Sequence, residues 1–161
     1  MSLRVGQGYD IHRLVPDRPL VLAGVTIPFD LGLEGHSDGD AICHALADAM
    51  LGAAGMGDIG THFPADDPKW KDASSITLLG SLTQTLAGVG LVVHNADVTA
   101  ILEVPRLGPY REEMVANLAR TLGIGPELVG VKGKSNERLG SVGAGDAIAA
   151  LAVVLIGPGD A

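Results

Sequence analysis

Apolar residues along the chain repeat with two different periods, and each period predicts a different kind of element. We expect strands where apolar and polar residues alternate, or where a short apolar run lies between turn residues. We expect helices where apolar residues recur every three or four positions. The pattern predicts strands over residues 3–9, 20–22, 25–27, 92–102, 129–134 and 147–156, and helices over residues 38–54, 74–87 and 109–122.

The predicted helix over residues 38–54 has a clear start signal. Ser37 and Asp40 have the spacing of a capping box, which places the helix start at Ser37. The apolar side of this helix is formed by Ala41, Ile42, Ala45, Leu46, Ala49 and Met50. The segments G-D-I-G and F-P-A-D-D-P that follow it are predicted loops.

The order of strands and helices predicts an α+β fold in a single domain over residues 1–161. We expect a single-layer mixed β-sheet with the helices packed on one face. Hydrophobic residues make up 47% of the chain and charged residues 19%, which excludes a disordered chain. Aromatic residues are only 3%, so the core consists of small aliphatic side chains and leaves apolar surface to bury between subunits.

Charge and cysteine content exclude several classes of partner. The formal net charge of −8 makes a broad electrostatic contact with nucleic acid or with an anionic membrane improbable. The longest apolar run, residues 147–156, is half the roughly 20 residues of a membrane span. The first ten residues lack the apolar stretch of a signal peptide, and the single cysteine suits a reducing compartment. We expect a cytoplasmic protein.

Candidate metal ligands stand at the end of the first predicted strand. Asp10 and His12 are two residues apart, so the alternation of a strand points both side chains to one face. With His44 from the first helix they form three mixed N/O ligands, as in a catalytic zinc site with an open fourth position. The alternative is a strand-end aspartate that caps a turn, beside two ordinary histidines.

Residues around His44 suggest further roles. His36 and Ser37 precede the predicted helix, where free N–H groups favour an anion such as phosphate, although Ser37 can simply cap the helix. Asp40 and Asp48 lie four residues on either side of His44, where either can orient the imidazole or be ordinary helix-surface charge.

Other reactive residues receive no role in catalysis. Cys43 is predicted to be a buried structural thiol, because neighbouring helix positions diverge by about 100° and point it away from the His44 face. Trp70 lies between lysines and is predicted to anchor a loop. His62 and His94 lack an identifiable set of partners.

A second polar cluster, residues 132–137, follows a predicted strand. Its lysines, Ser135 and Glu137 have the chemistry to hold a diphosphate, with Glu137 on a magnesium ion that bridges phosphate oxygens. A polar turn is the alternative. The segment is not a P-loop, because the glycine spacing of that motif is missing.

Seven motifs together resemble one enzyme family over nearly the whole chain. They are G-Y-D-I-H at 8–12, G-H-S-D-G-D at 35–40, H-A-L-A-D-A at 44–49, G-D-I-G at 57–60, F-P-A-D-D-P at 63–68, P-R-L at 105–107 and K-x-x-x-x-E-x-L-G at 132–140. In order and spacing they resemble the 2-C-methyl-D-erythritol 2,4-cyclodiphosphate synthase family. The resemblance implies a phosphorus–oxygen lyase of the non-mevalonate isoprenoid pathway, which closes CDP-methylerythritol 2-phosphate into a cyclic diphosphate and releases CMP.

The resemblance also implies a role for individual residues. Asp10, His12 and His44 would bind a divalent metal, usually Zn²⁺, and Glu137 a second one, Mg²⁺ or Mn²⁺. His36 and Ser135 would stabilise the transition state, with Ser135 where the family commonly has threonine. The substrate contacts it implies are Asp10, His12, His36, Ser37, Asp58, Ile59, Gly60, Phe63, Asp67, Leu102, Pro105, Arg106, Leu107, Lys134, Ser135, Asn136 and Glu137.

Assembly is part of what the resemblance implies. The family forms homotrimers with active sites at subunit interfaces, and an isoprenoid diphosphate has been suggested for the cavity on the trimer axis. The chain departs from the family pattern at Ala65, Ser141 and Ala144, which puts an acidic, an aromatic and an arginine contact in doubt. Two other hypotheses fit the same residues: a zinc-dependent phosphoesterase acting on CDP-alcohols, and a non-catalytic trimeric protein that binds a metal or an isoprenoid.

Overall fold

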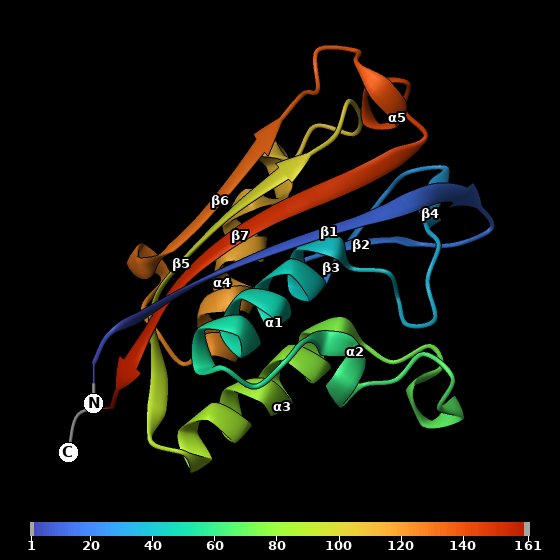
Figure 1. The fold of residues 1–161 in the computed structure, drawn as a ribbon. Helices are drawn as coiled ribbons and strands as arrows, with labels where there is room; N and C mark the ends of the chain where they lie inside the picture. Colours follow the sequence, from blue (N-terminus) through green and yellow to red (C-terminus); the bar gives the residue numbers. More distant parts are fainter. Residues whose placement is uncertain (1, 160–161) are drawn as a thin grey trace.

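A computed structural model describes residues 2–159, in which a five-stranded sheet carries its long helices on one side (Figure 1). The strands are β1 (Arg4–Pro16), β2 (Leu20–Leu22), β3 (Val25–Ile27), β4 (Leu31–Leu33), β5 (Leu91–Ile101), β6 (Val129–Lys134) and β7 (Ala147–Pro158). The helices are α1 (Ala41–Ala54), α2 (Ile59–His62), α3 (Ser75–Gly88), α4 (Arg111–Leu122) and α5 (Gly140–Gly143), with 3₁₀ turns at Pro68–Trp70, Gly108–Tyr110 and Pro126–Leu128. None of the helices within residues 2–159 is long and apolar enough to cross a membrane.

The main sheet is mixed, as the sequence predicts. Its strand order is β4-β1-β7-β5-β6, with β5 and β6 parallel and the other neighbours antiparallel. Strands β2 and β3 form a separate two-stranded sheet, which the prediction of a single layer did not include. The α+β fold class is confirmed.

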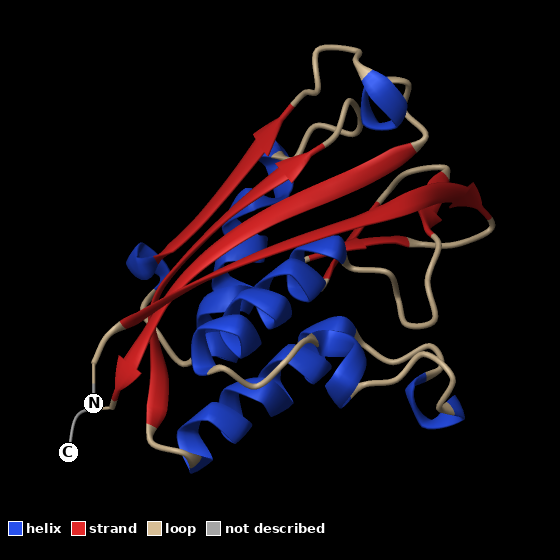
Figure 2. Ribbon diagram, in the orientation of Figure 1, coloured by secondary structure: helices blue, strands red, loops and turns tan. Residues whose placement is uncertain are grey.

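The two faces of the sheet differ in what covers them. Helices α1, α3 and α4 lie on one side, and inward-facing residues of β7 such as Ala150, Ala152 and Val154 are fully buried there (Figure 2). Among the described residues the opposite side, which we call the open face, carries only the short helix α5, whose Val142 packs against Ile101, Ala147 and Ala149 at one end of the sheet. The large apolar side chains of the open face are 37% to 69% exposed and are Val5, Tyr9, Ile11, Leu151 and Val153.

Strand β1 and helix α1 approach each other unusually closely, because β1 carries glycine at two inward positions. A Cβ atom on Gly6 would lie 1.9 Å from the carbonyl oxygen of Ala49, and one on Gly8 would lie 1.9 Å from that of Ala45. Further along the same face of β1 come Asp10 and His12. The close packing therefore brings both side chains beside the first turns of α1.

The start of α1 differs from the prediction. Asp40, and not Ser37, is the N-cap, and its carboxylate accepts hydrogen bonds from the N–H groups of Cys43 at 3.1 Å and Gly24 at 2.8 Å. Burial raises the pKa of Asp40, although these hydrogen bonds oppose the shift. The capping-box prediction is wrong because tertiary contacts turn the Ser37 hydroxyl toward His44 and Ser75.

Other boundaries shift where long-range contacts supply hydrogen bonds. Strand β1 continues to Pro16, well beyond the predicted end at residue 9, because β7 and then β4 pair with its polar second half. Strand β4 was not predicted. The G-D-I-G segment, predicted as loop, contributes the first residues of α2, with Asp58 as N-cap.

Replacement of Gly8 tests the close contact of β1 with α1. We expect Gly8→Ala to lower the free energy of unfolding by about 2 kcal/mol or more, because the helix backbone must move away from the new methyl group. Gly52→Ala is the matched control, since a Cβ atom there meets nothing within 4 Å. It should stabilise α1 by up to about 1 kcal/mol. Urea unfolding measures both, and equal stability of Gly8→Ala and the parent chain would contradict the packing argument.

Candidate active site

Three side chains predicted as metal ligands converge where β1 faces α1. The Asp10 Oδ2 atom lies 2.8 Å from His12 Nε2 and 3.0 Å from His44 Nδ1. The two histidine nitrogens are 3.1 Å apart. All three residues are half-buried, and the Asp10 carboxylate contacts the histidines instead of capping a turn. We call Asp10, His12 and His44 the triad.

The electrostatics of the triad reflect this mutual contact. Burial raises the pKa of Asp10, but hydrogen bonds and positive charge from His12 and His44 outweigh burial and hold that pKa well below its usual range. For His12, burial lowers the pKa, but the hydrogen bond and charge of Asp10 outweigh it, so the pKa of His12 is raised. The carboxylate thus stays ionised, as a metal ligand must.

The donor set fits a divalent cation. Ligand atoms of a tetrahedral zinc ion, each about 2.0–2.1 Å from the metal, lie roughly 3.3 Å from one another. The separations of the triad atoms, 2.8, 3.0 and 3.1 Å, are each within about half an ångström of that spacing. The Nδ1 atom of His12 lies 2.5 Å from the carbonyl oxygen of Glu34, an acceptor only, so Nδ1 carries the proton and Nε2 presents its lone pair to the triad.

The segment before α1 is fixed next to the triad. Ser37 is buried, and its hydroxyl lies 3.1 Å from His44 Nε2. The Arg18 guanidinium donates to the carbonyl oxygens of Gly35 at 3.0 Å and Ser37 at 2.6 Å. His36 Nε2 lies 3.2 Å from the carbonyl oxygen of Asp67. Sequence reasoning missed Arg18, because only its long-range contacts reveal its role.

The buried Asp40 carboxylate occupies the start of α1, and the binding of an anion near His36 and Ser37 stays a prediction. The contacts of His44 contradict another prediction about this region. Neither Asp40 nor Asp48 orients His44. Asp48 Oδ1 accepts a hydrogen bond from the N–H of Ile59 at 2.7 Å, whereas the His44 ring contacts the hydroxyls of Ser37 and Ser75.

The predicted substrate residues of the G-D-I-G segment lie near the triad. Asp48 comes one helical turn after His44, in the middle of α1, and accepts a hydrogen bond from the N–H of Ile59. This contact places Asp58 and Gly60 beside that part of the helix. Asp58 is exposed, and hydrogen bonds from the side chain and backbone of Thr61 lower its pKa.

The loop after α2 packs on itself. Phe63 meets Trp70 edge-on with ring centroids 4.9 Å apart, and Lys69 lies over the Trp70 ring. The Asp67 carboxylate caps the 3₁₀ turn at Pro68–Trp70. This packing agrees with the prediction of Trp70 as a loop anchor. Cys43 is buried, as predicted, and burial raises the pKa of its thiol well above the usual range.

The second predicted cluster borders an open pocket of about 900 Å³ between β6 and the segment that follows β5. Its lining includes the predicted residues Leu102, Pro105, Arg106, Leu107, Lys134 and Ser135. The hydroxyl of the lining residue Ser135 donates to Oε1 of Glu137, which lies outside the lining, at 3.0 Å. The pocket thus joins a partly apolar wall to cationic and hydroxyl groups, a composition that suits a nucleotide.

Glu103, which sequence reasoning missed, fixes the loop after β6. Its Oε1 atom accepts hydrogen bonds from the backbone N–H groups of Asn136 at 2.9 Å and Arg138 at 3.1 Å. Glu137 and Arg138 have φ values of 51° and 62°, a left-handed conformation that costs free energy for residues other than glycine. The two hydrogen bonds help to hold this conformation and the position of Glu137.

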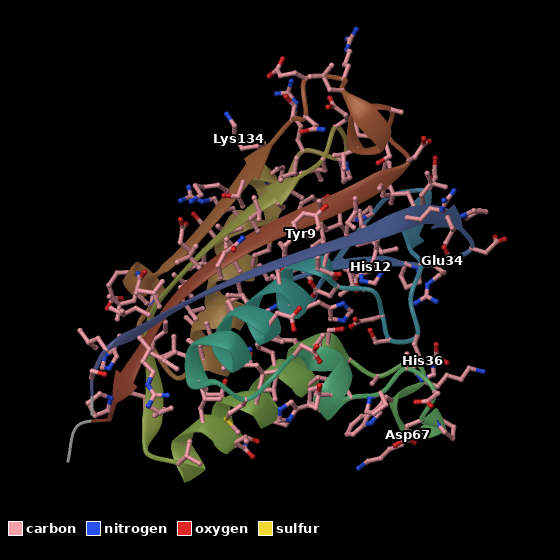
Figure 3. All side chains as sticks on the ribbon, viewed as in Figure 1. Tyr9, His12, Glu34, His36, Asp67 and Lys134 are labelled. Atoms are coloured by element: carbon pink, nitrogen blue, oxygen red, sulfur yellow. The ribbon has the colours of Figure 1, made fainter. Side chains whose placement is uncertain are left out.

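The triad and the pocket lie far apart within one chain. Strands β7 and β5 separate β1 from β6, which at about 4.8 Å per strand gives roughly 14 Å. Figure 3 shows His12 beside α1 and Lys134 at the opposite region of the sheet. The fold therefore brings the predicted site residues together as two groups.

A triad with the donor set for a divalent cation and a pocket edged by Arg106, Lys132 and Lys134 are typical of an enzyme that acts on a phosphorylated substrate. A family model described as the YgbB family matches residues 3–157. The 2-C-methyl-D-erythritol 2,4-cyclodiphosphate synthase of Laribacter hongkongensis (strain HLHK9) is 54% identical over 156 residues, which cover 97% of this chain and 96% of that protein. The chain therefore belongs to the YgbB family and is an enzyme.

Solved structures agree with this assignment. The CDP complex of IspF from Plasmodium falciparum is 34% identical with a TM-score of 0.86, and the match covers 99% of this chain and 98% of that one. The bifunctional IspDF from Campylobacter jejuni is 38% identical with a TM-score of 0.94, over 99% of this chain and 43% of that longer chain.

Removal of the Glu103 carboxylate tests its hold on the loop. We expect Glu103→Ala to expose the N–H groups of Asn136 and Arg138, so that their amide hydrogen exchange accelerates by about tenfold or more, equivalent to the loss of a hydrogen bond to a charged group. Glu103→Gln keeps an acceptor oxygen and serves as the control. Unchanged exchange in Glu103→Ala would show that the loop holds its conformation without Glu103.

Proposed function

We propose that the chain converts 4-(cytidine 5'-diphospho)-2-C-methyl-D-erythritol 2-phosphate to 2-C-methyl-D-erythritol 2,4-cyclodiphosphate and CMP in the non-mevalonate isoprenoid pathway. An oxygen of the 2-phosphate forms a bond to the β-phosphorus, and the bond from that phosphorus to the oxygen of CMP breaks. The reaction is formally that of a phosphorus–oxygen lyase. The triad is the observation that best supports this proposal. It offers the ligands for a cation in a chain whose relatives are named as this synthase.

The proposed metal sites follow from the donor sets. The triad would hold Zn²⁺ or another divalent cation, and Glu137 would hold Mg²⁺ or Mn²⁺ together with oxygens of the substrate diphosphate. When bound, such cations polarise the phosphoryl group and neutralise charge that develops on it. Glu137 is exposed and belongs to no second group of three metal-ligating side chains among the described residues, so substrate oxygens complete its ligand set.

The chain's own residues act by positioning and charge. Because the nucleophile is part of the substrate, no protein nucleophile is required, and alignment of the two phosphates is the main task. In this proposal His36 and Ser135 stabilise the transition state, and Lys134 and Asn136 lie beside the phosphates. Asp58 and Gly60 contact the ribose or erythritol hydroxyls, and the cytosine occupies the pocket formed by Leu102, Pro105, Arg106 and Leu107. Further substrate contacts come from Ser37, Ile59, Phe63 and Asp67.

Assembly as a homotrimer would complete the active site. The triad and the pocket are separated within one chain, so a substrate that bridges them requires the pocket of a neighbouring subunit. The open face supplies an apolar surface for that contact, with Val5 at 69% and Tyr9 at 52% exposure. We place this single-domain trimer in the cytoplasm, where an unpaired thiol such as that of Cys43 is stable. An isoprenoid diphosphate on the trimer axis would depend on the same assembly.

Phosphorus NMR of the purified protein with CDP-methylerythritol 2-phosphate, Zn²⁺ and Mg²⁺ tests the reaction directly. We expect a cyclic diphosphate to appear together with CMP. Release of CMP with a linear bisphosphate would indicate a phosphoesterase, and no turnover by a zinc-loaded trimer would indicate a non-catalytic protein. Either result overturns the proposal.

Two variants separate the two proposed metal sites. His44→Ala should lose Zn²⁺ and at least about 100-fold in turnover together, because it removes one of three ligands. Glu137→Gln should keep Zn²⁺ and lose the Mg²⁺-dependent turnover. Chelator competition measures Zn²⁺ affinity, with His94→Ala and Glu127→Gln as matched controls. Full activity in either variant would remove that residue from the site.

A charge on the open face tests the assembly. Leu151→Lys should convert the trimer to monomers in sedimentation equilibrium, because a buried unpaired ammonium group is costly. Turnover should fall by at least about 100-fold, since the substrate phosphates lose their alignment. Zn²⁺ affinity should persist, because all three triad residues belong to one chain. Val89→Lys, at an exposed site on the end of α3, is the control, and a parent protein that sediments as a monomer would contradict this prediction.

A further inference from the structure

Two buried hydroxyl groups and the half-buried carboxyl group of Asp38 lie behind His44, on the side away from Asp10. The Ser75 hydroxyl is 2.9 Å from His44 Nε2 and donates a short hydrogen bond to Asp38 Oδ1. Ser75 is only 1% exposed, so water does not replace these contacts. We propose that Asp38 and Ser75 form a hydrogen-bond relay that keeps the proton of His44 on Nε2 and leaves Nδ1 free to bind the cation.

The direction of each hydrogen bond follows from the donors around Asp38. Its Oδ2 atom accepts from the backbone N–H of Ser75 at 3.0 Å, and its Oδ1 atom accepts from the N–H of Asp40 at 3.2 Å. An ionised carboxylate has only acceptor oxygens, so the single hydroxyl proton of Ser75 points to Asp38. The Ser75 oxygen then has lone pairs left for His44, and it accepts the Nε2 proton.

The contacts of Ser37 are consistent with a hydrogen bond from His44 Nε2 to the Ser75 oxygen. Its hydroxyl lies 3.1 Å from His44 Nε2 and 3.2 Å from the Ser75 oxygen, and it accepts from the N–H of Gly39 at 3.3 Å. It can donate its proton to Ser75 while its lone pairs face His44. Ser37 alone does not fix the direction, because its hydroxyl is free to rotate and either donate or accept.

The backbone holds the relay in place. The N–H of Asp38 donates to the carbonyl oxygen of Ala73 at 3.1 Å, and the N–H of Asp72 donates to that of His36 at 2.8 Å. These bonds join the segment before α1 to the segment before α3. Ser74 is the N-cap residue of α3, but its side chain makes no capping hydrogen bond. The free N–H of Ser75 in the first turn donates instead to Asp38, which is far away in the sequence.

Asp38 thus has two contacts with Ser75 that variants can separate. Ser75→Ala keeps the backbone N–H that Asp38 accepts, and with it the start of α3, but removes the hydroxyl of the relay. Asp38→Asn keeps the size of the side chain but replaces one acceptor by a donor. If its amide group faces the Ser75 hydroxyl, Ser75 must donate to His44 Nε2, which shifts the proton to Nδ1 and opposes cation binding. Both residues are positioning residues, since they act through His44.

The inference rests on the cation site of the proposed function, so the experiment measures Zn²⁺ binding and not turnover. Removal of a group that orients a metal-binding histidine typically weakens metal affinity 10- to 100-fold. We expect the Zn²⁺ Kd of Ser75→Ala and of Asp38→Asn to rise within that range, measured by chelator competition. Ser81→Ala, another serine of α3, is the matched control and should bind Zn²⁺ as the parent does.

Proton NMR of the ¹⁵N-histidine-labelled, Zn²⁺-loaded protein gives a signature that a loss of packing alone would not produce. The parent should show a His44 Nε2–H signal that exchanges slowly with water, and Ser75→Ala should lose that protection while its circular dichroism stays native. If both variants bind Zn²⁺ and protect the His44 Nε2–H from exchange as the parent does, the relay is overturned but the proposed function is not. A parent chain that binds no divalent cation would instead overturn the proposed function.

Discussion

The contact of β1 with α1 determines the geometry of the triad. At Gly6 and Gly8 the strand lies against the helix carbonyl groups of Ala49 and Ala45, with no room for a side chain. This contact sets the register between the two elements, and the strand's alternation then places Asp10 and His12 opposite the turn that carries His44. A rigid strand and a buried helix therefore hold the three ligand atoms close together, as a functional site requires.

The cost of placing polar groups between β1 and α1 is partly offset by the hydrogen bonds that the outer ring nitrogens of the triad make. The triad side chains are half-buried, and each contacts the other two. The outer nitrogen of His12 is fixed by the carbonyl group of Glu34, and that of His44 by hydroxyl groups. Different segments of the chain thus orient both imidazoles. Since an unpaired buried polar group is costly, these contacts stabilise the fold as well as the site.

The division of the predicted site residues into two groups has a topological cause. The sheet order puts β1 and β6 on either side of β7 and β5, so no local movement can bring Glu137 to the triad within one chain. The same sheet leaves most of its second side without a long helix and lined with valine, leucine, isoleucine and tyrosine. In the proposed trimer, further copies of the chain would cover this apolar surface and complete the site, which links the proposed catalysis to assembly.

The sequence by itself determined the elements with strong periodicity: the helices on residues 41–54, 75–88 and 111–122 and the central strands agree with its pattern. It also determined that Asp10 and His12 share a face, because two residues is the period of a strand. Only the tertiary structure decided that Asp40 caps α1, that Ser75 and not Asp48 contacts His44, and that Glu103 holds the loop after β6. These contacts join residues far apart in the sequence, where no local spacing specifies the partner, and they depend on how β1, α1 and α3 pack.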